Sequence, residues 1–159
     1  MSNQDFSHVS PEGMPQMVDV SGKNATVRKA MAIALVNPGP EILQHFRDNE
    51  IHTKKGPVFQ TAVIAGVMAS KKTSDLIPFC HPLSLEDCQI RIHVQGDRIV
   101  IESEVTITGK TGVEMEALTA VTVAALTVYD MCKALSHDIT IEQVRLKEKT
   151  GGKKDFKRE

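Results

Sequence analysis

The stretch that decides the fold runs from Thr108 to Lys133, TGKTGVEMEALTAVTVAALTVYDMCK. A glycine-containing turn opens it, and a long apolar run follows, with charged residues only near its two ends. We expect this run to form a helix that is buried for most of its length. Glu114 and Glu116 suit the positive start of the helix dipole, and Asp130 and Lys133 share one face near its end. Because a lone D-x-x-K spacing is typical of an ordinary surface ion pair, other segments must decide whether these charges form a site.

The turn before this helix invites comparison with a phosphate-binding loop. Gly109-Lys110-Thr111 follows a predicted strand and precedes a helix, but the template requires a glycine five residues earlier, where this chain has Glu104. We therefore expect no Walker-type nucleotide site. Backbone amides of such a turn can still hold an anion, although Glu114 and Glu116 would oppose one. We interpret the turn mainly as a helix cap.

Length and composition restrict the class of protein. A chain of 159 residues fits one domain that buries roughly 70% of the surface of its unfolded chain. With 19 basic and 20 acidic residues, it has no general attraction to nucleic acid or to an anionic membrane. We also expect no apolar run to approach the ~20 residues of a membrane span. Cys80, Cys88 and Cys132 form no C-x-x-C motif, and no secretory signal is recognisable. We expect reduced thiols in a cytoplasmic protein, without a disulfide or a zinc site.

Residues 1–16 are polar and contain proline and glycine, which predicts a flexible arm. We expect residues 17–159 to form a single domain that ends in a basic, glycine-containing tail.

The pattern of apolar residues predicts an alternation of strands and helices. The expected elements are a strand at Val18–Val20, a strand or a helix at Val27–Val36, a short helix at Glu41–Asn49, a helix from Gly56-Pro57 to Lys71-Lys72, a hairpin of Leu85–Val94 and Arg98–Thr108 around Gly96-Asp97, the long helix, and a strand at Ile139–Leu146. This order indicates the α+β class, with an antiparallel sheet and helices packed on one face, as in ferredoxin-like folds. The helices are too few to cover both faces, so we expect an oligomer.

Two short segments carry candidate chemical groups. Ile77–Leu83 (IPFCHPL) has two prolines, which predict a stiff extended loop that presents Cys80 and His81. A lone histidine is more often structural, and a cysteine here is more often an inert thiol than a nucleophile. Lys54-Lys55, before Gly56-Pro57, is either surface charge or a phosphate contact at a loop-to-helix junction. The residues alone leave these alternatives open.

Several motifs taken together are more specific. They are Met17–Val20 (MVDV), Lys55-Gly56, Asp75–Leu83 (DLIPFCHPL), Thr108–Lys133 and Gly151–Lys153 (GGK). In these motifs the chain resembles the MoaC-type cyclic pyranopterin monophosphate synthases of molybdenum cofactor biosynthesis, over nearly its whole length after the arm. One departure is Phe79, where the family often has leucine, and we expect little consequence.

The resemblance implies a lyase that converts (8S)-3',8-cyclo-7,8-dihydroguanosine 5'-triphosphate into cyclic pyranopterin monophosphate and diphosphate, with no cofactor or metal. It assigns catalysis to Asp130, Lys133 and Lys55. It assigns substrate binding to Phe79, Cys80, His81, Met115, Glu116, Glu114 and Arg28. It also implies a homohexamer, built as a trimer of dimers with sites at a subunit interface, and makes Val27–Val36 a strand.

Interface sites would remove a geometric difficulty. Glu116 and Asp130 are fourteen residues apart, or ~21 Å along a straight helix, which is too far for one small ligand. Two copies of the helix packed antiparallel could bring the start of one to the end of the other. The alternative functions are a non-catalytic nucleotide-binding regulatory module and a structural assembly protein, and the latter leaves Asp130, Lys133 and His81 unexplained together.

Overall fold

The structure, a computed structural model, describes residue 10 and residues 12–159. The arm predicted for residues 1–16 thus lies largely outside the described residues. The main sheet has five strands in the order β5-β6-β1-β7-β8, and all neighbours are antiparallel. Its strands are β1 (Thr26–Asn37), β5 (Asp87–Gln95), β6 (Arg98–Gly109), β7 (Thr140–Thr150) and β8 (Phe156–Lys157).

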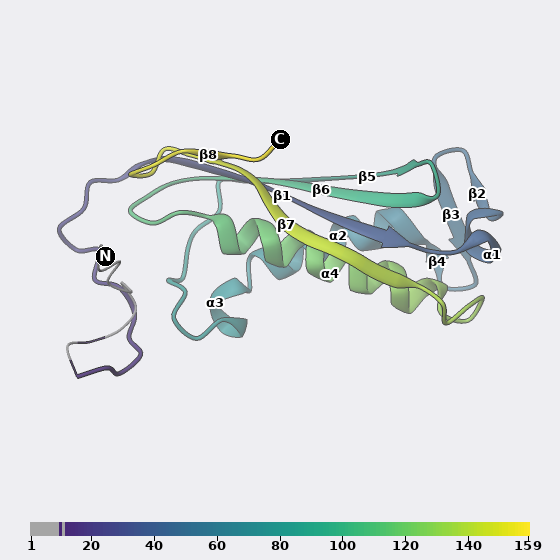
Figure 1. The fold of residues 1–159 in the computed structure, drawn as a ribbon, viewed down its shortest axis with the longest axis horizontal. Helices are drawn as coiled ribbons and strands as arrows, with labels where there is room; N and C mark the ends of the chain where they lie inside the picture. The colour runs from purple at the N-terminus through teal and green to yellow at the C-terminus, as the bar shows by residue number, and fades with distance from the viewer. Residues whose placement is uncertain (1–9, 11) are drawn as a thin grey trace.

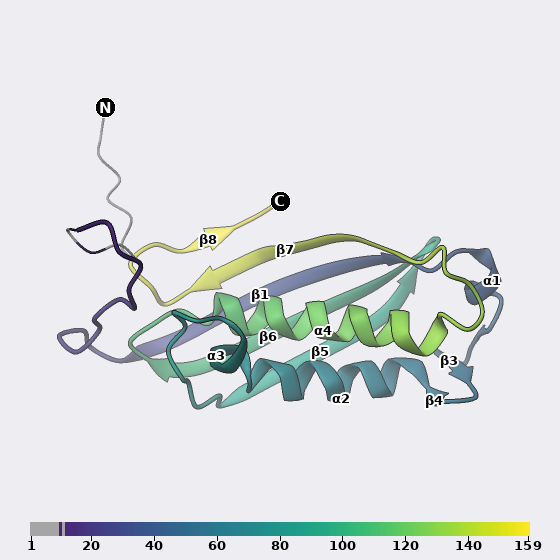
Figure 2. The ribbon, with the colours of Figure 1, turned by 90° about the horizontal axis from the view of Figure 1, so that it is seen from below.

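Two long helices, α2 (Val58–Ser70) and α4 (Glu114–Cys132), cover one face of this sheet (Figure 1). Helix α4 contacts β1, β6 and β7, and α2 contacts β5 and α4. The helices lie side by side and run in opposite directions (Figure 2), so the start of α2 is next to the end of α4. The predicted α+β class, with an antiparallel sheet and helices, is confirmed.

Smaller elements lie at the two ends of the helix layer. The segment before α2 contains α1 (Pro40–Leu43), β2 (Phe46–Arg47), β3 (Glu50–Thr53) and β4 (Gly56–Pro57), and the three strands form a second sheet in the order β2-β3-β4. At the other end, α3 (Thr73–Leu76) leads into the proline-containing loop, near the start of α4 (Figure 2).

Three local predictions need correction. Val18–Val20 forms no strand. The helix expected over Glu41–Asn49 ends at Leu43, and Asp48 and Asn49 instead form the turn between β2 and β3, with positive φ angles of 51° and 62°. Asp and Asn tolerate this left-handed conformation better than most residues do. The short strands β2, β3, β4 and β8 were not predicted.

The ambiguous segment Val27–Val36 is a strand, β1, with partners on both sides. The hairpin prediction is confirmed, because Gln95 pairs with Arg98 across the two-residue turn Gly96-Asp97. Gly96 has a φ of 62°, which glycine adopts at no steric cost.

Small residues bring α2 and α4 close together. A Cβ atom on Gly66 would lie 2.8 Å from the carbonyl oxygen of Ala120 and 3.3 Å from Cβ of Ala124. These alanines and Val121 are fully buried. The small side chains therefore set the spacing between the helices, and with it the distance between the start of α2 and the end of α4.

Helix α4 contradicts the expectation that no segment is long and apolar enough to cross a membrane. It has 19 residues and a mean hydropathy of 1.3 over 18 of them. In the fold, however, its buried side chains pack against the sheet and α2. Its apolar character is thus accounted for by its place in the core.

The face of the main sheet opposite the helices carries ion pairs between strands. Lys147 Nζ lies 2.9 Å from Glu102 Oε1, and Arg98 Nε lies 2.7 Å from Glu142 Oε2. Since β1 lies between β6 and β7, both pairs span it. The open face therefore carries paired charges.

Exposed apolar side chains also lie on the helix layer. Ile64 and Met68 of α2 are each 62% exposed, and Leu126 of α4 is 53% exposed. Both helices turn their buried residues toward the core, so these three side chains belong to the outer surface of the layer.

Candidate functional site

The residues predicted to form a site fall into two groups at opposite ends of α4. The first group, which we call the acid–lysine cluster, consists of Lys55, Asp130 and Lys133. The second lines a cleft at the start of α4, which we call the cationic cleft. The turn that carries Lys55 lies at one end of the helix layer, and the loop that follows α3 lies at the other (Figure 2).

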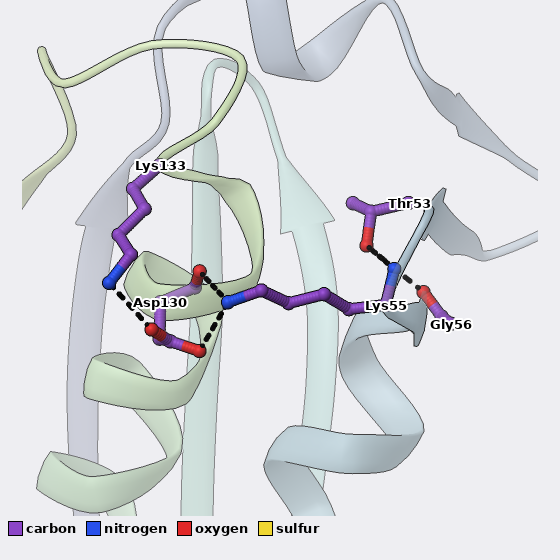
Figure 3. Close-up of polar contacts among 5 residues, drawn as sticks. All are labelled: Thr53, Lys55, Gly56, Asp130 and Lys133. Carbon is purple, nitrogen blue, oxygen red and sulfur yellow. Dashed lines mark hydrogen bonds and ion pairs between the residues drawn. The ribbon is translucent and has the colours of Figure 1, made fainter.

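In the acid–lysine cluster, two ammonium groups hold one carboxylate (Figure 3). Lys55 Nζ donates to Asp130 Oδ2 at 2.8 Å and to the main-chain carbonyl oxygen of Asp130 at 2.9 Å. Lys133 Nζ lies 2.8 Å from Oδ1 of the same carboxylate. The side chains are about half exposed, at 49%, 54% and 48% for Lys55, Asp130 and Lys133. The expected contact between Asp130 and Lys133 is confirmed, and Lys55 joins it from a different element.

These contacts fix the protonation states. The hydrogen bonds from Lys133 and then Lys55 lower the pKa of Asp130 from 3.8 to about 2. The hydrogen bond and charge of Asp130 in turn raise the pKa of Lys133. At neutral pH the cluster therefore contains a deprotonated carboxylate between two ammonium groups, which is a base beside two acids.

Lys55 is presented by a tight turn. The pairing of Thr53 with Gly56 joins β3 to β4 and leaves Lys54 and Lys55 as the turn residues. The backbone N–H of Lys55 donates to Oγ1 of Thr53 at 3.2 Å, and Gly56 has a φ of 112°, which favours glycine. The turn thus directs Lys55 across to the end of α4.

The cationic cleft has a volume of about 760 Å³. It lies among the segment after the arm, the proline-containing loop, the start of α4 and the end of β7. All seven residues predicted to bind substrate line it: Arg28, Phe79, Cys80, His81, Glu114, Met115 and Glu116. Phe79 is 41% exposed and Met115 is 37% exposed, so both offer apolar surface to a ligand.

The cleft carries an excess of positive charge. Its basic lining residues are Lys23, Arg28, Lys110, Lys149 and Lys153. Its two carboxylates oppose an anion less than the sequence suggested. Lys149 Nζ pairs with Glu114 Oε1 at 2.7 Å, and burial raises the pKa of Glu116, which is only 4% exposed.

The turn before α4 and the Cys80 thiol were also the subject of predictions. Helix α4 begins after Val113, which provides no side-chain cap, so the interpretation of the preceding turn as mainly a cap was wrong. Burial, and then the charge of Glu116, raises the pKa of the Cys80 thiol, which favours the inert-thiol alternative. All three cysteines are free.

Sequence reasoning missed most of the cleft lysines, because each one alone looks like solvated charge. The available signal was the Gly151–Lys153 motif. Gly151 has a φ of 81°, and a Cβ atom there would collide with the carbonyl oxygen of Val27. Glycine thus lets the chain after β7 approach β1 and brings Lys149 and Lys153 beside Arg28. Within residues 10 and 12–159, no group of three His, Cys, Asp or Glu side chains could hold a metal ion.

Comparison with known proteins places both groups within one family. Residues 17–152 match the profile of the MoaC family, so the match includes the acid–lysine cluster and nearly all of the cleft. The chain is 50% identical over 156 residues to Molybdenum cofactor biosynthesis protein 1 of Drosophila melanogaster. That alignment covers 97% of this chain and 27% of the fly protein, so the chain spans about a quarter of its relative's length. On these matches, the chain belongs to the MoaC family.

Proposed function

We propose that the chain is a cyclic pyranopterin monophosphate synthase, a lyase that converts the cyclised guanosine triphosphate derivative into cyclic pyranopterin monophosphate and diphosphate. The observation that carries the proposal is the acid–lysine cluster, in which Lys55 and Lys133 hold the Asp130 carboxylate from two sides. Such a cluster can accept and donate protons at neighbouring positions, as the opening and rebuilding of rings requires.

Release of diphosphate needs a second kind of group. A substrate hydroxyl attacks the α-phosphorus, the new P–O bond closes the cyclic phosphate, and the bond to the diphosphate breaks. The hydroxyl proton must go to a base, and the diphosphate takes up the negative charge of the broken bond. Lysines and an arginine around a cleft stabilise that charge, which is the role we assign to Arg28, Lys149 and Lys153.

The resting cluster also indicates how Asp130 becomes reactive. A carboxylate with a pKa of about 2 is a weak base, because both of its oxygens already accept hydrogen bonds from ammonium groups. If a substrate phosphate or hydroxyl takes over one lysine, the pKa of Asp130 rises toward its ordinary value and the carboxylate becomes a stronger base. We infer that substrate binding activates Asp130 by drawing Lys55 or Lys133 away.

Neither group can make a complete site within one chain. Glu116 in the cleft and Asp130 in the cluster are separated by ~21 Å along α4. We therefore infer that the cleft of one subunit meets the cluster of another. Two copies related by a two-fold axis, with α4 helices antiparallel, would achieve this and would bury Ile64, Met68 and Leu126. The trimer of such dimers, a homohexamer, is the assembly that the family resemblance implies.

We also propose that the fold is ferredoxin-like. The order β1-α2-β5-β6-α4-β7 and the sheet order β5-β6-β1-β7 support a ferredoxin-like arrangement. In this arrangement α2 and α4 run antiparallel on one face of the sheet, where they can form the proposed contact with a second subunit.

Production of the pterin tests the function directly. Purified protein incubated with the cyclised triphosphate should yield cyclic pyranopterin monophosphate and diphosphate in equal amounts. A non-catalytic nucleotide-binding module would bind the triphosphate without producing either. The binding module is the less favoured function, because it leaves the Asp130 carboxylate between Lys55 and Lys133 without a role. Phosphate binding by the cleft does not need that carboxylate.

A further inference from the structure

Glu50 is a buried carboxylate that the site as described does not use. Glu50 is 7% exposed and is the first residue of β3. Its Oε1 accepts hydrogen bonds from the backbone N–H groups of Ile51 at 2.8 Å and Phe59 at 2.7 Å, and its Oε2 accepts one from Gln60 at 3.2 Å. A buried charge with three hydrogen bonds, all to backbone, is a specific local arrangement.

The arrangement supplies what the start of α2 lacks. Pro57 precedes the helix and provides no side-chain cap, and there is no acidic residue in the first turn. Glu50 instead satisfies the amides of Phe59 and Gln60 from outside the helix, and its charge suits the positive end of the helix dipole. These two amides are therefore already occupied by Glu50 and are not free to bind a phosphate.

The same hydrogen bonds close a small loop in the chain. They join β3 to α2 across residues 50–60, and the turn that carries Lys55 lies inside this loop. At its tip, Oγ1 of Thr53 accepts from the backbone N–H of Lys55 and donates to the carbonyl oxygen of Gly56 at 3.4 Å. The backbone of Lys55 is thus fixed from two sides before its long side chain reaches Asp130.

We propose that Glu50 is a positioning residue for Lys55, acting through the closed loop of residues 50–60. The proposal rests on the proposed function and deepens it. Without the Glu50 carboxylate, the turn gains alternative conformations, and Lys55 spends less time within reach of Asp130. A small displacement of a catalytic group lowers the rate of the chemical step far more than it lowers substrate affinity.

The test is a double-mutant cycle on the full chain in its assembled state. Glu50→Gln keeps the size of the side chain but turns an amide NH₂ toward backbone N–H groups. Lys55→Ala removes the ammonium group that we propose Glu50 positions. Turnover and KM are measured for the wild type, both single variants and the double variant, with melting curves on the same preparations.

We expect Glu50→Gln to lower kcat roughly tenfold with little change in KM, as a misplaced charge-assisted contact would. In the Lys55→Ala background the same change should cost almost nothing further, because its effect passes through Lys55. Equal fold-losses in both backgrounds would overturn the proposal, as would an unchanged kcat in Glu50→Gln. If Lys55→Ala itself leaves turnover intact, the assignment of Lys55 under the proposed function fails instead.

Ser103→Ala serves as the matched control. Ser103 is 1% exposed, and its Oγ donates to the carbonyl oxygen of Ala117 at 2.8 Å, so it also joins two elements through a buried hydrogen bond. It lies away from the Lys55 turn. A lower melting temperature with unchanged kcat in this variant separates loss of stability from loss of positioning.

If Glu50→Gln does not fold, Thr53→Val tests whether the closed loop of residues 50–60 positions Lys55. Valine has nearly the same shape, and it removes both hydrogen bonds at the tip of the turn. A fall in kcat that disappears in the Lys55→Ala background supports positioning by the closed loop, and an unchanged kcat overturns it.

Discussion

The two ends of α4 differ in how their charges are satisfied. At the end of the helix, Asp130 has an ammonium group on each carboxylate oxygen, and the cluster is locally complete. At the start, five basic side chains line a cleft with two carboxylates, of which Glu114 is paired and Glu116 is buried. The first arrangement is suited to moving protons, and the second to holding a strongly anionic ligand. The two groups at the ends of one helix thus differ in chemistry, and we propose that they are half-sites completed by another subunit.

The largest expected effect is at the end of α4. Asp130→Asn keeps nearly the same shape but removes the proton-accepting group, so turnover should fall by roughly 10² to 10⁴. Fold, assembly and substrate binding should persist, since the cleft is untouched. Single-turnover rates and melting curves on one preparation measure both properties. A purely structural ion pair predicts the reverse pattern, a lower melting temperature with nearly normal turnover per folded protein.

At the start of α4, a smaller effect of a different kind is expected. Lys149→Ala removes one cation that we assign to the triphosphate, and loss of one charge-assisted contact should raise KM roughly tenfold. The value of kcat should change less than in Asp130→Asn. Lys147→Ala is the matched control, because Lys147 is on the same strand but pairs with Glu102 on the open face of the sheet. Equal effects of the two variants on KM would remove Lys149 from the binding site.

The smallest expected effect concerns acid stability. The pKa of Asp130 in the folded protein, about 2, is below the ordinary value of 3.8, so its ion pairs stabilise the fold above pH 3.8. This contribution is lost as the pH falls through about 2. The difference in melting temperature between wild type and Asp130→Asn should therefore be constant near neutral pH, shrink as the pH falls below 3.8 and vanish below about pH 2. It should be small, because the side chains are about half exposed and solvent screens them. A difference that grows as the pH falls would contradict the assigned direction of the shift.

The sequence predicted those features that depend on neighbouring residues. The hairpin at Gly96-Asp97, the run of α4 and the contact of Asp130 with Lys133 follow from turn chemistry, apolar periodicity and helical spacing. The strand at Val27–Val36 does not follow from such local patterns. Its apolar run fits both the period of a strand and that of a helix, and only its pairing with β6 and β7 decides between them.

Features formed by long-range contacts were not predictable from residue patterns alone. Lys149 and Glu50 look like surface charges in the sequence, and folding places one in the cleft and the other under the start of α2. The predicted substrate-binding residues came from the family motifs, and the structure gathers all of them into one cleft. Their individual roles in binding stay predictions.

We propose that the cleft of one subunit and the acid–lysine cluster of another make one site. Subunit complementation tests it most directly. Asp130→Asn and His81→Ala proteins, each nearly inactive alone, are co-expressed or are unfolded and refolded together so that their subunits mix. With random mixing, a shared site receives an intact cluster and an intact cleft in about a quarter of cases, so the mixture should regain about a quarter of wild-type turnover. Turnover no higher than that of the separate variants, in assemblies shown to contain both chains, would mean that each site lies within one subunit and would contradict the account.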